Sequence, residues 1–193
     1  MLDREAILTA TEDALRRYGP AKATVLDVAR ELKVSHAAVY RYFPSKAALR
    51  EAVTRRWLAR AHDDLTEIAA SAEPAPQRLR HWLTAIFAVK RAAATDDPEL
   101  FATYGVLAAE NSDAAAEHVA DLLSQLQGIV ADGVSSGAFA VTDVAAAARA
   151  VFDATTPFHH PAHADTWNQP DAEARLDAVC TLIDAGLRVR RPG

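Results

Sequence analysis

The stretch that decides the fold runs from Thr24 to Lys46 and reads TVLDVARELKVSHAAVYRYFPSK. It predicts two short helices joined by a turn of about three residues. Thr24 and Asp27 have the spacing of a capping box, which begins the first helix, and Ser35 is a suitable N-cap for the second. Phe43-Pro44-Ser45 then interrupts the helical pattern, because proline disfavours helix at the residue before it. The stretch therefore predicts a compact, angular pair of helices.

The second of these helices carries small and polar side chains in the pattern that DNA reading requires. A helix enters the major groove, about 12 Å wide, only if its N-terminal turn is uncluttered. We expect Ser35 and His36 to reach base edges, and the methyl groups of Ala37 and Ala38 to touch thymine methyls.

Phosphate contacts are expected from the flanks of this pair, where they set the register without reading sequence. The residues are Thr24, Tyr40, Tyr42 and Lys46, with Arg41 able to contact either phosphate or base. The alternative is an ordinary helical hairpin in a bundle, with Tyr40 and Tyr42 at the edge of the core.

The charge distribution favours the nucleic-acid interpretation. The whole chain of 193 residues has a net charge of −5. Residues 1–60 hold 12 Lys and Arg against 7 Asp and Glu, a balance of +5, whereas residues 61–193 hold 9 against 19, a balance of −10. A basic end on an acidic body suits a protein that approaches DNA with one face.

The remainder of the chain is predicted to be helical throughout, giving an all-α fold of about nine helices. Alanine is abundant, and no stretch alternates apolar and polar β-branched residues. The predicted helices span about 3–18, 24–32, 35–41, 45–71, 76–94, 112–136, 142–156 and 171–189, with a further one that Asp96-Asp97-Pro98 opens. Gly19-Pro20 is a predicted stop, and a His-rich loop is expected at 157–170. We expect a three-helix DNA-binding domain at 1–46 and a helical bundle at 47–193.

The pattern T-x-x-D-V-A-x-x-L-x-V-S-x-A-A-V-Y-R-Y-F-P-S-K-x-A-L, from Thr24 to Leu49, resembles the DNA-binding signature of the tetracycline-repressor (TetR) family of bacterial regulators. The resemblance implies a homodimer with one helix-turn-helix per subunit and a C-terminal domain that binds a small-molecule effector. It also implies a recognition helix over Ser35 to Tyr42. The family commonly has glycine where this chain has Lys33, so we expect a strained left-handed backbone there, offset by a phosphate contact from Lys33.

A dimer is also expected because one recognition helix reads too few base pairs to compete against a genome. The resemblance places the interface on the helices over about 142–156 and 171–189, whose alanine-rich faces would allow close approach. The alternative is that these faces pack within one subunit.

Aromatic residues of the C-terminal region are candidates to line an apolar effector pocket, or else belong to an ordinary core. They are Trp82, Phe87, Phe101, Tyr104, Phe152 and Phe158.

A second candidate site consists of three histidines. His118, His159 and His160, together with a nearby carboxylate, would suit zinc, nickel or iron as ligands. The alternative there is a solvated loop whose histidines lie near a helix C-terminus.

Enzymatic function is not expected. Gly133-Val-Ser135-Ser-Gly137 satisfies the G-x-S-x-G pattern of hydrolases, but that motif must follow a strand, and here it closes a helix. The only enzymatic alternative is a metal-dependent enzyme built on His118, His159 and His160.

The sequence has no apolar run long enough for a membrane span, and its acidic start differs from a signal peptide. We therefore expect a cytoplasmic, nucleoid-associated protein.

The sequence thus predicts a ligand-responsive transcriptional regulator, expected to be a repressor, that binds a palindromic double-stranded DNA operator as a homodimer. A small-molecule effector, with or without a linked metal ion, would release it. The alternative function is that of a helical metal-binding protein.

Overall fold

The computed structural model describes residues 2–60, 63–110 and 112–188. Within these ranges the chain forms helices and no strand apart from an isolated bridge between Phe139 and Arg188, which confirms the predicted all-α class. The described residues fall into two compact units, the first from Met1–Arg60 and Ala94–His118 and the second from Ala61–Ala93 and Val119–Gly193. None of the helices described combines the length and the apolar character needed to cross a membrane.

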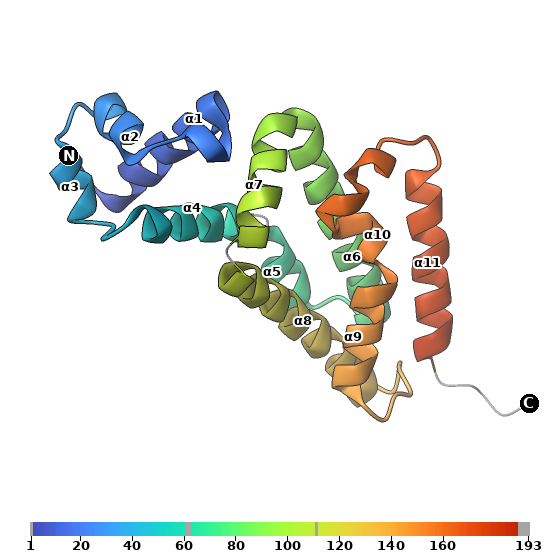
Figure 1. Ribbon diagram of the computed structural model, residues 1–193. Coiled ribbons are helices and arrows are strands. Elements are labelled where there is room, and N and C mark those ends of the chain that lie inside the picture. The colour runs from blue at the N-terminus through green and yellow to red at the C-terminus, as the bar shows by residue number, and fades with distance from the viewer. Residues whose placement is uncertain (1, 61–62, 111, 189–193) are drawn as a thin grey trace, which may run out of the picture. The chain divides into compact units, whose positions relative to one another are not determined.

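The first unit is built on the N-terminal helices, and α7 packs against two of them, α1 and α4. Its helices are α1 (Arg4–Lys22), α2 (Val25–Glu31), α3 (His36–Tyr40), α4 (Lys46–Arg60) and α7 (Pro98–Glu110) (Figure 1). Ile7, Val28, Val39, Val53 and Leu107 are all buried in the core of this unit. Each helix contributes one apolar face to this core, which fixes where the short α3 lies.

Local capping groups set the boundaries of these helices as the sequence predicts. The Thr24 side chain accepts from the Asp27 backbone N–H while the Asp27 carboxylate accepts from the Thr24 N–H, a complete capping box at α2. Ser45 Oγ accepts from the Ala48 N–H at 3.0 Å at the start of α4. At Gly19 the backbone φ is +71°, so the predicted stop is a break within α1.

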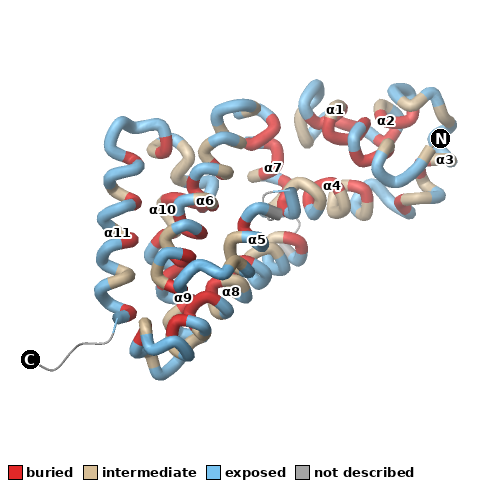
Figure 2. Tube along the Cα trace, turned by 180° about the vertical axis from the view of Figure 1, so that it is seen from behind, coloured by how far each residue is buried: buried red, intermediate tan, exposed pale blue. Residues whose placement is uncertain are grey.

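The second unit contains the remaining helices, except for residues 94–96 at the end of α6 and 112–118 at the start of α8, which belong to the first unit. They are α5 (Asp63–Ala70), α6 (Ala75–Asp96), α8 (Ser112–Ser135), α9 (Val144–Ala154), α10 (Thr156–His159), the 3₁₀ helix η1 (Pro161–Thr166) and α11 (Ala172–Leu187). Trp82, Leu126, Ile129, Ala148 and Trp167 are buried in its core. In contrast, only four of the sixteen residues of α11 are buried (Figure 2).

Two sequence predictions need correction. The described residues contain eleven α helices and one 3₁₀ helix instead of about nine helices, and α4 and α5 are separate where one helix was predicted over 45–71. The predicted loop at 157–170 contains α10 and η1, because Pro157 and Pro161 each lie in the first turn of a helix, where a missing N–H has no consequence. Both prolines therefore begin helices.

The end of α8 depends on a close approach of the chain to its own helix. The Gly133 carbonyl accepts from the N–H groups of Ala138 and Phe139, at 2.9 and 3.0 Å, around the positive φ of Gly137. This turn folds the Phe139 ring back against Gly133, where a Cβ would overlap the ring. The two glycines of the G-x-S-x-G string are thus explained by a tight helix end.

We predict that Gly133→Ala lowers the free energy of unfolding by about 1–3 kcal/mol, because the buried Phe139 ring must move. Gly128→Ala is the matched control on the same helix, since nothing lies near its Cβ position. It should raise stability by up to about 1 kcal/mol. Urea titration of both variants measures the difference, and equal effects would contradict this account of Gly133.

Candidate nucleic-acid interface

The turn between α2 and α3 is a Schellman motif with a lysine at its left-handed position. The Val34 N–H donates to the Ala29 carbonyl at 3.0 Å and the Lys33 N–H to the Arg30 carbonyl at 3.1 Å. Lys33 has φ +55°, and it is the one non-glycine residue with positive φ in the described ranges. The left-handed backbone predicted at this position is therefore confirmed, and the Lys33 side chain is exposed.

The N-terminal turn of α3 is open to solvent. Ser35 Oγ accepts from the Ala38 N–H at 3.2 Å and so caps the helix as predicted. Ser35, His36 and Ala37 are exposed, Ala38 is half-buried, and the His36 ring meets Tyr40 edge to face at 4.6 Å. Contact with Tyr40 restricts the His36 imidazole to one side of the helix, as a base-reading side chain requires.

Two of the predicted phosphate-binding hydroxyls have internal partners. The Thr24 hydroxyl donates to Asp27 at 2.5 Å, and this hydrogen bond is the first cause of the lowered pKa of the Asp27 carboxyl. The half-buried Tyr42 donates its phenol proton to the Leu2 carbonyl at 2.7 Å. Both residues therefore stabilise the unit itself, besides any contact they make to DNA. Tyr40 is half-buried, whereas Arg41 and Lys46 are exposed.

The surface around α3 is basic because the sequence between Glu31 and Glu51 contains no acidic residue. Lys33, Arg41 and Lys46 are all exposed in this interval. Charges of one sign within a few residues of a helix that can enter a groove provide the sequence-independent part of DNA affinity. The predicted DNA-binding residues thus all lie between Thr24 and Lys46, in one unit and around one helix.

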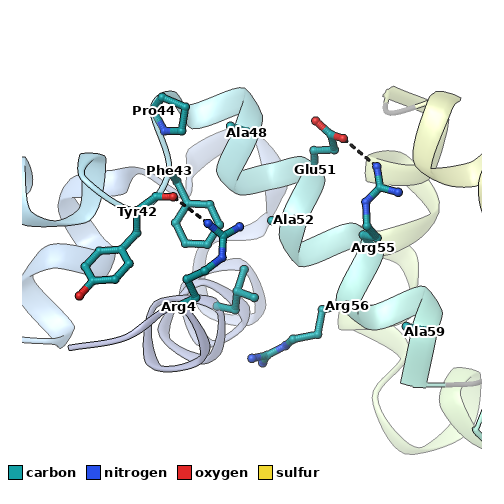
Figure 3. A pocket seen from close by; sticks show the side chains of 11 residues that line it. Arg4, Tyr42, Phe43, Pro44, Ala48, Glu51, Ala52, Arg55, Arg56 and Ala59 are labelled. Atoms are coloured by element: carbon teal, nitrogen blue, oxygen red, sulfur yellow. Dashed lines mark hydrogen bonds and ion pairs between the residues drawn. The ribbon is translucent and has the colours of Figure 1, made fainter. Parts of the chain in front are cut away.

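Arg4 holds the end of α3 in place, a role that sequence reasoning missed. Its guanidinium donates to the Tyr42 carbonyl at 3.0 Å and lies over the Phe43 ring at 4.4 Å (Figure 3). Arg4 lines a hollow of about 490 Å³ together with Phe43 and residues of α4. The hollow belongs to the first unit, and none of the six aromatic residues predicted for the effector pocket lines it.

A buried ionic network joins α1, α4 and α7 within the same unit. Glu12 is 6% exposed, and its carboxylate accepts from Arg56 at 2.9 Å, Arg60 at 3.0 Å and the Tyr104 hydroxyl at 3.2 Å. Trp57 stacks on Tyr104 with centroids 4.4 Å apart. Burial, followed by the adjacent Glu12 charge, raises the pKa of Tyr104, so this phenol stays protonated and donates. The spacing Leu8, Glu12, Leu15 places Glu12 on the apolar stripe of α1 and is the signal that sequence reasoning overlooked.

The six aromatic residues predicted for an effector pocket divide between the two units. Phe101 and Tyr104 belong to the first unit, where both rings contact Trp57. The other four, Trp82, Phe87, Phe152 and Phe158, belong to the second. There Phe87 meets Phe158 edge to face at 5.8 Å, and Trp82 donates to Gln125 at 2.8 Å. The effector pocket remains a prediction, with its aromatic wall in the second unit.

The predicted histidine site gains no support from the structure. His159 is buried and its Nε2 lies 3.1 Å from the Phe152 carbonyl, whereas His160 is exposed and its Nδ1 accepts from the Ala162 N–H at the start of η1. His118 is half-buried on α8. In the part of the chain that the structure describes, no three His, Cys, Asp or Glu residues gather as a metal ion would require.

Comparison with known proteins covers both parts of the chain. Residues 7–53 match the family model of bacterial regulatory proteins of the tetR family, and residues 75–180 match the tetracyclin repressor-like C-terminal domain. No curated protein sequence matches.

Solved structures of regulators share the fold over the full length. A TetR transcription regulator from Haloarcula marismortui is 20% identical, with 96% of this chain and 98% of that one covered and a TM-score of 0.74. FadR from Bacillus subtilis, solved with stearoyl-CoA, is 17% identical, with 96% and 100% covered and a TM-score of 0.71. A structure described as the molecular basis for control of antibiotic production by bacterial hormones is 25% identical, with 96% and 97% covered and a TM-score of 0.63.

We predict that Lys33→Gly raises the free energy of unfolding by about 1 kcal/mol while weakening DNA binding. Glycine relieves the left-handed strain, but the phosphate contact predicted for Lys33 is lost. Thermal unfolding and fluorescence anisotropy over a range of salt concentrations measure the two effects. Lys33→Ala is the control, since it removes the charge and keeps the strain, so it should weaken DNA binding equally with no gain in stability. Unchanged DNA affinity in both variants would exclude Lys33 from the interface.

Proposed function

The chain belongs to the tetR family of bacterial regulatory proteins, so it is a DNA-binding transcription factor and not an enzyme, and we propose that it represses transcription by binding a palindromic operator as a homodimer. The observation that carries this proposal is the exposed N-terminal turn of α3, which presents Ser35, His36 and Ala37 amid basic side chains. Repression is the simplest consequence of operator binding, because a protein that occupies a promoter needs no surface for contact with another protein.

Exposed small residues on α9 and α11 support a dimer built from these two helices. Leu182 on α11 is 73% exposed, the largest exposed fraction among the large apolar side chains of the described residues. Ala178 and Ala185, one turn to either side of it, are exposed too. Small side chains around a projecting leucine allow a second helix to approach closely and cover the apolar surface.

The contacts of α7 support an effector mechanism. Through Tyr104, α7 contacts Trp57 of α4 and Glu12 of α1. In the chain α7 follows α6 and precedes α8, and both supply buried residues to the second unit. A ligand that binds one arrangement of these helices more tightly than another would shift α7 and with it α4. Two recognition helices that fit DNA about 34–36 Å apart would then lose their spacing.

We predict that Lys46→Ala and His36→Ala weaken DNA binding in different ways. Loss of the Lys46 charge should lower affinity for every sequence and reduce the salt dependence by about one ion per subunit. His36→Ala should cost about 1–3 kcal/mol on the preferred operator and leave random DNA unaffected.

In vitro selection from random DNA identifies the operator, and fluorescence anisotropy on operator and random duplexes measures both effects. Arg80→Ala, which removes a cation of α6 outside the predicted DNA-binding and dimer segments, is the control and should bind DNA normally. Equal losses on both duplexes for His36→Ala would rule out base reading by His36. Failure of the unmodified protein to bind any duplex at low salt would overturn the proposed function.

We predict that Leu182→Asp converts the dimer into a monomer, because a charge would be buried where two copies meet. Light scattering after size-exclusion chromatography measures the mass, and operator affinity should fall with it. Val106→Asp places the same charge at another exposed apolar residue, 48% exposed on α7, and should remain dimeric. A dimeric Leu182→Asp protein would exclude this face as the interface.

A further inference from the structure

The hollow of about 490 Å³ in the first unit is lined by residues of α1, of α4 and of the segment that follows α3 (Figure 3). Its volume falls within the range of small-molecule sites in proteins, which is about 300–1,000 Å³. All of its lining residues lie in the first 60 residues of the chain, so it is separate from the effector pocket predicted in the second unit. One wall consists of Tyr42, Phe43 and Pro44, so a molecule in the hollow would lie next to the end of α3.

Small side chains along one stripe of α4 leave this space open. Ala48, Ala52 and Ala59 all line the hollow, and their spacing of four and seven residues places them on one face of the helix. The buried side chains of Leu8 and Phe43 also line it, so its floor is apolar. A longer apolar side chain at position 48 would fill part of the space, so the hollow depends on the alanine there.

The charged residues that line the hollow carry an excess of positive charge. They are three arginines and one carboxylate, Glu51. Arg55 pairs with Glu51 at 2.9 Å. Arg56 pairs with Glu5 and Glu12 of α1, both at 2.9 Å. Two of the three arginines are therefore already matched by carboxylates of the protein.

The third arginine, Arg4, has neutral partners. Within the described residues its guanidinium contacts the Tyr42 carbonyl at 3.0 Å and the Phe43 ring at 4.4 Å, and no carboxylate of these residues pairs with it. Arg4 is exposed, and it lines the hollow together with the apolar side chains. A guanidinium matches a carboxylate with two parallel hydrogen bonds, so Arg4 is suited to bind an anion whose apolar part enters the hollow.

We propose that the hollow binds a small organic acid, with its carboxylate on Arg4 and a flat apolar ring against Leu8, Ala48 and Ala52. The ring removes apolar surface from water, and the carboxylate supplies the counter-charge that Arg4 lacks. A neutral ring would gain only the first of these terms, and an acid without a ring only the second. The site therefore selects molecules that combine both features.

Such an acid would act directly on the recognition helix. Arg4 holds the Tyr42 carbonyl, directly behind α3. A hydrogen bond to a charged acceptor is stronger than one to a neutral carbonyl, so the bound acid draws the guanidinium away and leaves the end of α3 less firmly held. Acid and operator should therefore weaken each other's binding by the same factor. This consequence rests on the proposed function, whereas binding of the acid does not.

Isothermal titration calorimetry with 2-naphthoate tests the site in the full-length protein. The controls among ligands are 2-naphthamide, which has the same shape and no charge, and acetate, which has the charge and no ring. 2-Naphthoate should bind about tenfold more tightly than either, or better, and Arg4→Met should lose about tenfold in affinity for 2-naphthoate and none for 2-naphthamide. Arg17→Met changes another exposed arginine of α1, one that does not line the hollow, and should bind like the unmodified protein.

A second pair of variants tests the hollow without changing any charge. Ala48→Leu fills part of the space and should weaken binding of both 2-naphthoate and 2-naphthamide. Ala47→Leu adds the same side chain at the neighbouring exposed position, outside the lining, and should bind both as the unmodified protein does. This pair decides the question even if Arg4→Met does not fold.

The outcomes separate the site from the proposed function. Failure of 2-naphthoate to bind, or undiminished binding by either Arg4→Met or Ala48→Leu, overturns the site even if operator binding is intact. Binding that depends on Arg4 and Ala48, in a protein that binds no DNA duplex, supports the site and overturns the regulator. Release of the operator by 2-naphthoate in the unmodified protein, but not in Ala48→Leu, supports the site and its effect on α3. Acid binding that leaves operator affinity unchanged supports the site and overturns that effect.

Discussion

The position of the DNA-binding helix depends on one buried carboxylate. Glu12 is almost entirely buried, and a carboxylate in that environment is tolerated only when charged or polar partners surround it. Arg56 and Arg60 come from α4 and the Tyr104 hydroxyl comes from α7, so compensating one charge brings three helices together. Such a network contributes less to stability than to a unique arrangement, because apolar packing alone would allow the helices to slide. With α1 and α4 held in this way, Arg4 of α1 can hold the segment that follows α3 through the Tyr42 carbonyl, while α3 itself packs against α2.

The same contacts explain how α7 can respond to a ligand although it is tightly packed against α1 and α4. The Tyr104 side chain makes two contacts: its ring stacks on Trp57, and its hydroxyl donates to the Glu12 carboxylate. Stacked rings and charge-assisted hydrogen bonds both depend steeply on geometry, so a small displacement of α7 changes both at once. Packed interfaces of this kind have discrete alternative arrangements, which is the property that a two-state switch requires.

Sequence reasoning succeeded where the determinants are local. The capping groups at Thr24, Ser35 and Ser45, and the left-handed turn at Lys33, involve residues at most five apart, so the pattern contains all the information. It failed where one residue type has two roles. The loop predicted over 157–170 is wrong because Pro157 and Pro161 each lie in the first turn of a helix, a position to which proline is well suited. It also missed pairs that only the tertiary fold brings together, such as Glu12 with Arg56. No local signal reports such pairs, although a charged residue on an apolar stripe is a reason to search for them.

Lys33 illustrates why a departure from good local design is informative. A glycine at position 33 would remove the strain of the left-handed backbone, so this lysine lowers the stability of the folded chain. Costs of this kind are expected where a side chain serves binding, since stability alone would favour a different residue. Lys33 is exposed directly before α3, so the departure points to contact with an anionic duplex.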